Sequence, residues 1–437
     1  MAAMTESTNS AAVLAGERAD VRRAVELIGQ LLLGSVSERS TLEGFLHSNL
    51  GKSGSDVVCE SRKLSSIGHV TVGLVLADLI DRFDPAIGPG DDDQPPTWGH
   101  VKIGEVELAA PSALSVYFPA AEIAPAPVVV RLCENHSFDD GPRLLVFTLA
   151  EDRAHGVAVI ERIISESEGA RNLFRGRALA ASSNHGTLVL EVVESIVVAR
   201  DDVIVPASVW SEIDLNVAAV TSRRELMTEL GLGVRRGVLL AGPPGVGKTA
   251  ITQAIAAEML GEFTVITVDA RAGESALSGV YREARSLGPT VVVLEDIDLI
   301  VGHRRGGGNA SALSEFLAVM DIDPTAPILT VASTNDASTL DAAAIRSARF
   351  DSIVEVGYPD RGMAGLILQR YLQGVPGADA VQPEAVTAHF GPEISGADIR
   401  EIVRRTVLLN GCVSESDLIA TVQSGRFRPE LPVGNYL

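Results

Sequence analysis

The stretch that decides the fold is Gly242-Pro243-Pro244-Gly245-Val246-Gly247-Lys248-Thr249. It follows a strand-like apolar run at 237–240 and opens a helix-like run at 250–260, which is the context that a phosphate-binding loop requires. Glycines let backbone N–H groups surround phosphate oxygens, and a helix N-terminus adds the positive end of its dipole. We therefore expect these eight residues and Ala250 to bind a nucleotide, with Lys248 on its β- and γ-phosphates and Thr249 on Mg²⁺.

A second apolar run, at 291–294, ends in acidic residues. Its composition indicates a buried parallel strand, and Glu295, Asp296 and Asp298 follow at its C-terminal end. Open α/β sheets bind ligands at the carboxyl ends of their strands. The carboxylates that hold Mg²⁺ and activate water in an ATPase are expected at this place, and acids that merely solvate a strand end are the alternative.

A third run, at 328–332, precedes Asn335, and a pair of arginines follows. Asn335 could hydrogen-bond the attacking water or the γ-phosphate beside the acids, or it could simply turn the strand end. Arg346 and Arg349 are three residues apart, a spacing that usually places two solvated side chains on a helix. Their guanidinium groups could instead reach the γ-phosphate of a neighbouring subunit and stabilise the transition state.

Taken in order, these segments resemble the AAA family of ATPases from about Val209 to the C-terminus, and residues 340–351 resemble the family's second region of homology. Residues 273–275 are similar to the segment before one family helix, and residues 394–399 to the family's lid-helix motif. By this resemblance Gly396 and Ala397 lie near adenine and ribose. A helix cap formed by Ser395 or Asp398 is compatible with that role.

The resemblance implies an α/β fold, in which a P-loop parallel-sheet ATPase subdomain at 206–360 precedes a small helical lid at 361–437. It also implies ATP and Mg²⁺ as cofactors, ATP hydrolysis as the activity, and a homo-oligomer, most often a hexameric ring. The implied roles are Mg²⁺ ligands for Thr249 and Glu295, a base for Asp296, a γ-phosphate sensor for Asn335, and contacts across the subunit interface for Arg346 and Arg349.

Two departures from the family pattern bear on activity. The family's Asp-Glu order is inverted to Glu295-Asp296, so the base is one methylene shorter. Since misplacement by about 1 Å can cost about 10²-fold in rate, we expect slow hydrolysis.

The segment at 267–273, in the region of the first pore loop, carries no aromatic residue with which to grip a threaded polypeptide. The glycine-rich segment at 303–308 is either a surface loop or a basic ring for an acidic partner.

The first half of the chain predicts a separate domain. A chain of 437 residues exceeds one ordinary core, so two or three domains are expected. Apolar runs at 128–132, 144–149 and 188–193 and a helix-like segment at 155–167 indicate a mixed α/β domain within 1–205, which we assign to binding a substrate or partner. An amphipathic helix is expected at 14–33 and a linker at 203–217.

Composition indicates which classes of partner and which location suit the chain. The net charge of −21 opposes the phosphate backbone of nucleic acids. Three cysteines without a CxxC pair fit a reducing compartment, and no signal peptide or membrane-spanning run is evident, so a cytoplasmic location is expected. The sequence thus predicts an ATPase that remodels a protein or protein complex. The alternatives are a nucleotide-dependent switch or scaffold with little turnover, and, less favoured, a nucleic-acid motor.

Overall fold

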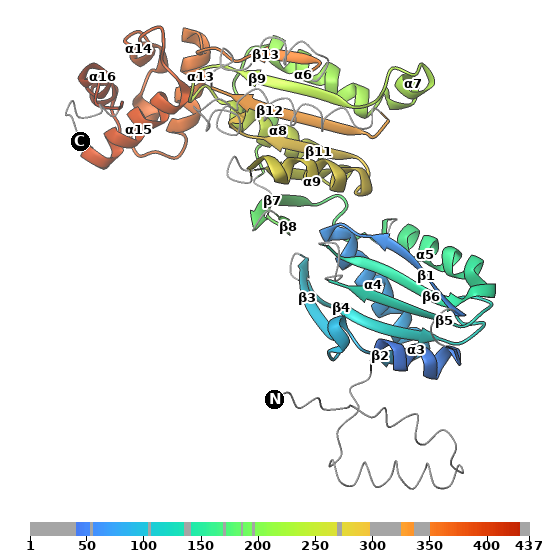
Figure 1. Ribbon diagram of the computed structural model, residues 1–437. Helices are drawn as coiled ribbons and strands as arrows, with labels where there is room; N and C mark the ends of the chain where they lie inside the picture. Colours follow the sequence, from blue (N-terminus) through green and yellow to red (C-terminus); the bar gives the residue numbers. More distant parts are fainter. Residues whose placement is uncertain are drawn as a thin grey trace, which may run out of the picture.

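The protein is described from a computed structural model that covers residues 41–52, 56–103, 106–134, 141–168, 172–184, 187–194, 197–268, 273–297, 325–335 and 350–428. These residues form an N-terminal domain, a larger sheet with helices on both faces, and a group of helices at the C-terminal end (Figure 1). The expected helix at 14–33 lies outside the described residues.

The N-terminal domain is built on an antiparallel sheet with the order β1-β6-β5-β4-β2, and β3 pairs with β4. Helices α4 and α5 share a core with one face, and α3 packs on Val129 of the other. Alternate residues of β5 supply both faces because successive side chains in a strand point in opposite directions. Its elements are α3 (Leu42–Leu50), β1 (Val57–Lys63), α4 (Ser66–Phe83), β2 (Ala86–Gly88), β3 (Thr97–Ile103), β4 (Val106–Phe118), β5 (Val128–Cys133), β6 (Arg143–Leu149) and α5 (Arg153–Glu168).

The second sheet has the order β13-β9-β12-β11-β10-β7-β8, and all its pairs are parallel except β7 with β8. Every residue of β11 and β12 is buried, as expected for strands covered on both faces. Its strands are β7 (Ala178–Asn184), β8 (Thr187–Val192), β9 (Arg236–Ala241), β10 (Thr264–Val268), β11 (Thr290–Leu294), β12 (Ile328–Thr334) and β13 (Ser352–Glu355). The predicted α/β fold with a parallel ATPase sheet is confirmed. Residues 178–192, which we had placed in the N-terminal domain, supply two of its strands.

Helices cover both faces of this sheet. One core joins α6 (Ala207–Val220) and α8 (Lys248–Met259) to the sheet, and another joins α9 (Gly273–Ser286) to its opposite face. The prediction of a linker at 203–217 is wrong over most of that range, because helix α6 begins at Ala207. Val209, Ile213 and Val220 recur at helical spacing and are buried, so packing against the sheet fixes the helix. The short α7 (Arg224–Glu229) follows.

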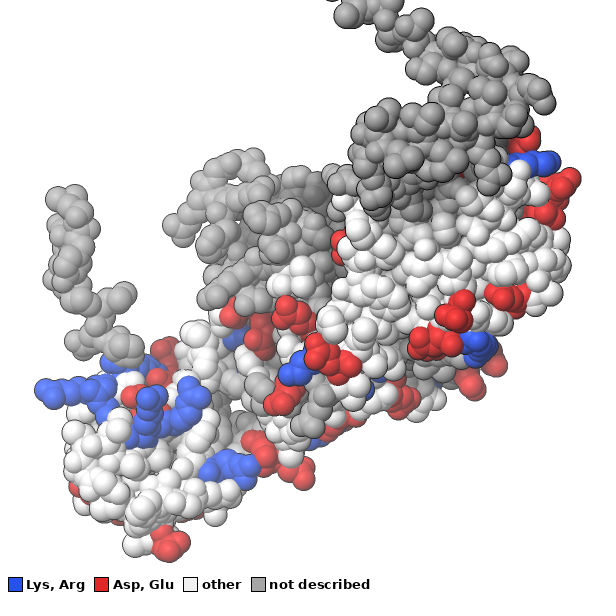
Figure 2. Space-filling view, turned by 90° about the horizontal axis from the view of Figure 1, so that it is seen from below, with Lys and Arg blue, Asp and Glu red and all other residues white. Residues whose placement is uncertain are grey.

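The C-terminal helices α13 (Arg361–Leu372), α14 (Pro383–Thr387), α15 (Gly396–Asn410) and α16 (Glu415–Ser424) share one hydrophobic core and form the predicted small helical lid. The Asp360 side chain caps α13 by accepting a hydrogen bond from the Met363 amide. In the view of Figure 2, Lys and Arg side chains gather at the lid end, whereas Asp and Glu are spread over the remainder of this face. Among the helices of the described ranges, none is both long and apolar enough to cross a bilayer.

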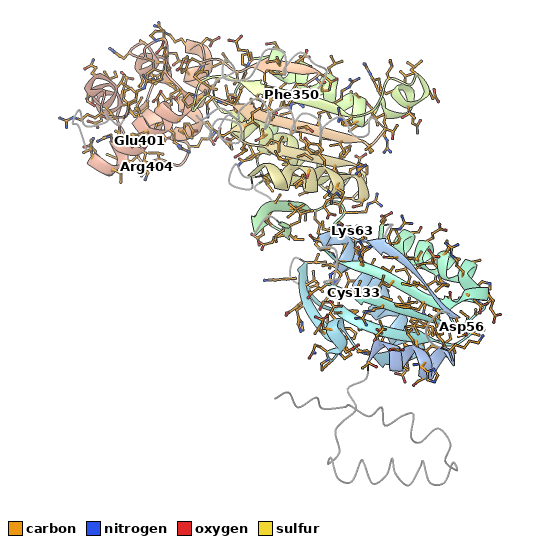
Figure 3. The ribbon with its side chains drawn as sticks, viewed as in Figure 1. Asp56, Lys63, Cys133, Phe350, Glu401 and Arg404 are labelled. Atoms are coloured by element: carbon orange, nitrogen blue, oxygen red, sulfur yellow. The ribbon has the colours of Figure 1, made fainter. Side chains whose placement is uncertain are left out.

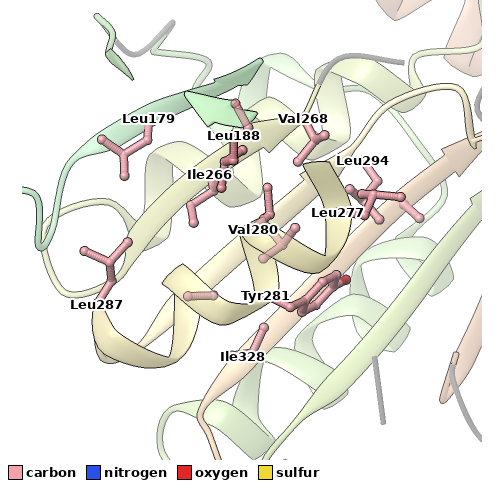
Figure 4. Close-up of a cluster of buried hydrophobic side chains, with 14 of the residues drawn as sticks. Leu179, Leu188, Ile266, Val268, Leu277, Val280, Tyr281, Leu287, Leu294 and Ile328 are labelled. Atoms are coloured by element: carbon pink, nitrogen blue, oxygen red, sulfur yellow. The ribbon is translucent and has the colours of Figure 1, made fainter. Parts of the chain in front are cut away.

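The N-terminal domain adjoins the edge of the large sheet formed by β7 and β8. Lys63 lies at the end of that domain which faces the sheet (Figure 3). The Ser66 hydroxyl of α4 donates a hydrogen bond of 3.0 Å to the Leu188 carbonyl of β8. Ile67 and Ile103 join a buried cluster centred on α9 and the sheet, part of which is drawn in Figure 4. The two domains are therefore joined by apolar packing as well as by the chain itself.

Candidate functional site

The turn between β9 and α8 has the backbone that the glycine-rich sequence predicts. Gly245 and Gly247 have φ values of 81° and 105°, in the left-handed region that favours glycine. A Cβ on Gly242 would lie 2.0 Å from the Val356 carbonyl oxygen, so the close approach of the following segment also requires glycine there. The loop therefore wraps around the start of α8 at the carboxyl end of β9.

Lys248 is the first residue of α8 and is only 6% exposed. Its Nζ donates hydrogen bonds to the carbonyls of Gly242 (2.8 Å) and Pro243 (2.9 Å) and to Oδ1 of Asn335 (2.9 Å). A buried ammonium group is costly unless oxygen atoms surround it. These contacts hold the Lys248 charge between the loop and the end of β12.

Asn335 links the lysine to the acids. Its Nδ2 donates a hydrogen bond of 2.9 Å to Oδ1 of Asp296, which follows β11. Asp296 has a positive φ of 50°, and its amide donates to the Ser333 hydroxyl at 3.1 Å. Aspartate is one of the few non-glycine residues that adopt this conformation readily. The ends of β11 and β12 thus bring together residues that are 39 positions apart in the sequence.

Glu295 and Asp296 are directed to different surroundings. Asp296 lines the pocket described below, whereas Glu295 accepts a 3.3 Å hydrogen bond from the Thr252 hydroxyl on the second turn of α8. Thr249 lines the same pocket as Asp296. The two carboxylates therefore flank the start of α8, one toward the pocket and one against the helix.

A pocket of about 700 Å³ runs along the loop between the sheet and the lid, a size typical of small-molecule sites. Its wall includes residues 244–250, Asp296, Asn335, Gly396 and Ala397, all of which the sequence predicted. Gly242 and Pro243 lie beside it through their contacts with Lys248.

Sequence reasoning missed the other end of the pocket. Residues 202–205, Gln253 of α8, and side chains of lid helices α13 and α15 complete the wall; the lid contributes Ile367, Arg370, Tyr371 and Arg400. The spacing of the three α13 residues, at i, i+3 and i+4, places them on one helix face and was the available signal.

The lid contacts the loop directly. The Ala397 amide donates a 3.1 Å hydrogen bond to the Gly245 carbonyl, and Ser395 caps α15 in a reciprocal capping box with Asp398. Burial would raise the pKa of Asp398, but hydrogen bonds from Arg428 and Ser395 outweigh it and lower that pKa. The helix cap and the contact with the loop coexist in the 394–399 motif.

Several predicted residues lie outside the described parts of the chain. They are Asp298, Arg346 and Arg349, together with residues 269–272 of the first pore-loop region and the glycine-rich segment at 303–308. Their assignments stay predictions.

The fold and the pocket define a P-loop nucleotide-binding domain, since the glycine loop, the buried lysine and the strand-end carboxylate and amide meet at the carboxyl edge of a parallel sheet. Residues 238–358 match the family described as ATPase family associated with various cellular activities (AAA). Residues 238–358 of this chain therefore form an ATPase domain of the AAA family.

Relatives with curated names support this assignment. The ATP-dependent zinc metalloprotease FtsH 3 of Conexibacter woesei is 31% identical over 298 residues, covering 62% of this chain and 38% of the relative. The ATP-dependent zinc metalloprotease FtsH 4 of Sphaerobacter thermophilus is 34% identical over 196 residues, covering 41% and 29%. Protein SAV of Sulfolobus acidocaldarius is 33% identical over 195 residues, covering 42% and 25%. The chain thus spans well under half the length of these relatives.

Proposed function

We propose that this protein is a Mg²⁺-dependent ATPase that couples hydrolysis to the remodelling of a protein or protein complex. The observation that carries the hydrolytic part is the hydrogen-bonded series Lys248–Asn335–Asp296 along the wall of the pocket. It provides a cation for phosphate, an amide that can orient water, and a carboxylate that can accept a proton, all at one edge of the sheet.

The donor chemistry fits Mg²⁺. Thr249, in the pocket wall, offers a hydroxyl oxygen, and Glu295, beside the pocket against α8, offers a carboxylate oxygen, both hard ligands of the kind that Mg²⁺ prefers. Asp296 is the carboxylate that lines the pocket itself. The parts of the chain that the structure describes contain no group of three or more His, Cys, Asp or Glu able to hold a metal, so the remaining ligands would be water and nucleotide phosphate. When bound, Mg²⁺ would neutralise charge on the phosphates. The hydrogen bond from Thr252 would keep Glu295 oriented toward the start of α8.

The residues of this chain have distinct roles in the proposed reaction. Lys248 binds the β- and γ-phosphates, and its charge favours the negative transition state. Asp296 accepts a proton from the attacking water, while Asn335 holds both Asp296 and the γ-phosphate region in place. Residues 202–205 and the lid residues Ala397 and Tyr371 line the opposite end of the pocket, where the base and ribose would lie.

The assembly and the substrate are further parts of the proposal. The family resemblance favours a ring of identical subunits in which Arg346 and Arg349 reach the neighbouring nucleotide. The relatives named as proteases act on protein, which favours a protein substrate for this chain too. The N-terminal domain, which lies outside the matched residues 238–358, is the part that we assign to choosing that substrate.

Phosphate release tests the hydrolytic proposal. We expect Mg²⁺-dependent turnover by the wild type, none by Asp296→Asn, and none by Lys248→Ala. Glu401→Gln, in an exposed part of the lid far from the N-terminal domain (Figure 3), is the control and should match the wild type. Absence of turnover by the wild type at every protein concentration would refute hydrolysis.

The remodelling proposal needs a second test. When loaded with ATP and mixed with a lysate, Asp296→Asn should retain bound partner proteins. The ATP-free protein and Lys248→Ala should release the same partners. Identical partners with and without ATP would contradict coupling to the nucleotide.

A nucleotide-dependent switch is the second candidate, and the inverted Glu295-Asp296 order favours it. The shorter Asp296 side chain is hydrogen-bonded to Asn335, which limits its reach toward water. If the protein is a switch, Asp296→Asn will keep the cellular function that Lys248→Ala loses.

A further inference from the structure

A second cavity lies between the N-terminal domain and α9, away from the nucleotide pocket. It has a volume of about 360 Å³, and its wall is formed by the end of β1, the start of α4, the end of α5 and helix α9. None of its lining residues lines the nucleotide pocket. We call it the interdomain cavity.

Basic side chains enter this cavity from both domains. Arg62 and Lys63 come from the end of β1, and Arg282 and Arg285 come from one face of α9. Lys63 lies where the N-terminal domain faces the large sheet (Figure 3). Among the described residues that line the cavity, Glu168 is the one acid. The described lining thus carries four basic side chains and one acidic side chain, although the chain as a whole has a net charge of −21.

The three arginines are exposed, and within the described ranges Arg62, Arg282 and Arg285 form no salt bridge and donate no hydrogen bond. The charge of Arg282 does act on the neighbouring Glu283. Like charges brought together across an interface oppose docking unless a counter-charge lies between them. Acidic residues are abundant in this protein, yet the surface that brings these arginines together does not pair them.

A buried acid on α9 is hydrogen-bonded to the N-terminal domain instead. Glu283, on α9, is 2% exposed and accepts a hydrogen bond of 2.8 Å from the Ser65 hydroxyl at the start of α4. Burial raises the pKa of this carboxyl, against the opposing hydrogen bond from Ser65 and the charge of Arg282. Glu283 thus joins the two domains and does not form an ion pair with the arginines beside it.

Asn172 adds a neutral donor at the same place. Its side chain lines the cavity and the residue is 5% exposed. Oδ1 accepts a hydrogen bond of 3.1 Å from the Phe174 amide, which identifies Nδ2 as the free end. No described residue accepts a hydrogen bond from Nδ2. This nitrogen is therefore available to donate a hydrogen bond to a ligand that enters the cavity.

We propose that the interdomain cavity binds the phosphate groups of a small phosphorylated molecule. Guanidinium groups match phosphate oxygens with paired N–H donors, and the Asn172 amide can donate to the same anion. A bound anion would relieve the repulsion between Arg62 and the α9 arginines and would tie the N-terminal domain to the ATPase sheet. This site is independent of the ATP pocket and adds a ligand that controls how firmly the two domains are joined.

Inorganic pyrophosphate is a suitable probe in calorimetry on the full chain, with ADP and Mg²⁺ at saturation so that the P-loop is filled. The wild type should bind one pyrophosphate per chain. The double variant Arg62→Ala/Arg285→Ala should bind it about tenfold or more weakly, because two charge-assisted contacts are lost. Arg404→Ala, in the exposed part of the lid, is the matched control and should bind normally.

Asn172→Asp gives a second, more conservative test. It preserves the oxygen that accepts from Phe174 and replaces the donor with a negative oxygen, so pyrophosphate binding should be lost while the fold remains. Lys248→Ala should still bind pyrophosphate even if it no longer binds ATP, which separates this site from the proposed ATPase. No binding by the wild type, or equal binding by the wild type, the double variant and Asn172→Asp, would overturn the proposal.

Discussion

Asp202 and Arg370 form a 2.5 Å ion pair that joins the segment before α6 to lid helix α13, and both residues line the nucleotide pocket. Among the described residues, this is the one ion pair between the lid helices and the rest of the chain. Two residues earlier, Arg200 is fixed by Asp214 at 2.6 Å and by the ring of Trp210. The pair therefore fastens the lid to a well-anchored segment beside the proposed base end of the pocket.

We predict that Arg370→Ala weakens nucleotide binding about two- to fivefold, the range expected for a partly exposed ion pair. Titration with a fluorescent ADP analogue measures the dissociation constant. The charge exchange Asp202→Arg/Arg370→Asp should return it to near the wild-type value. Arg361→Ala, on the same helix, is the control. If the charge-exchanged variant binds the ADP analogue more weakly than either single variant, the ion pair does not hold the lid in the nucleotide-binding position.

Asn335→Ala should lower kcat about 10²-fold with a much smaller change in KM. The reason is that Asn335 is the hydrogen-bonded link between Lys248 and Asp296, so its loss disturbs orientation more than binding. Steady-state phosphate release over a range of ATP concentrations separates the two parameters. A variant whose KM rises while kcat stays unchanged would assign Asn335 to binding instead.

Asp296→Glu tests the reach of the proposed base. If the short side chain limits the rate, adding one methylene should raise kcat about tenfold, provided that the added length closes the distance to water. Asp296→Asn, measured in the same assay, supplies the baseline without a base. A Glu variant as inactive as the Asn variant would mean that the aspartate geometry is already optimal.

Glu283→Gln should change the pH dependence of stability. Burial raises the pKa of Glu283 above its ordinary value of 4.5, so the folded state favours the protonated form. Its contribution to stability is complete below pH 4.5 and is lost as the pH rises through the raised pKa. The melting temperature of the Gln variant relative to the wild type should therefore increase between pH 5 and pH 8.

The control for that measurement is Glu401→Gln, whose side chain is 36% exposed on the lid. Its melting temperature should follow that of the wild type across the pH range. If Glu283→Gln is instead increasingly destabilised toward pH 8, the ionised carboxylate stabilises the start of α4, and the direction inferred from burial is wrong.

The local sequence was sufficient to predict the residues at the phosphate end of the pocket. The glycines at 242, 245 and 247 are dictated by backbone geometry, and the acids and Asn335 directly follow apolar strands that could be recognised by composition. The opposite end could not be found in this way. Asp202, Arg370 and Arg400 line one pocket only because the lid packs beside the sheet. The spacing of Arg370 with its neighbours on α13 marks one helix face, but it does not by itself indicate a ligand.

Tertiary pairing also decided the domain architecture. The run at 188–193 was recognised as a strand, but its partner is β7, and β7 in turn pairs with β10 more than 80 residues later. Helix α6 was not predicted because it lies between two domains, where a linker is expected, although one apolar face of the helix is buried. Ser65 and Glu283, which are 218 residues apart, carry no sequence pattern that would indicate their contact.

The proposed function depends on the loop at 242–249 binding a triphosphate that Asp296 and Asn335 face. Calorimetric titration of Asp296→Asn with Mg²⁺ and ATP tests it directly, with Lys248→Ala titrated in parallel. We expect Asp296→Asn to bind one ATP per chain without turnover, and Lys248→Ala to bind ATP about 10- to 100-fold more weakly. Equal ATP affinity in the two variants, or no ATP binding to either, would contradict it.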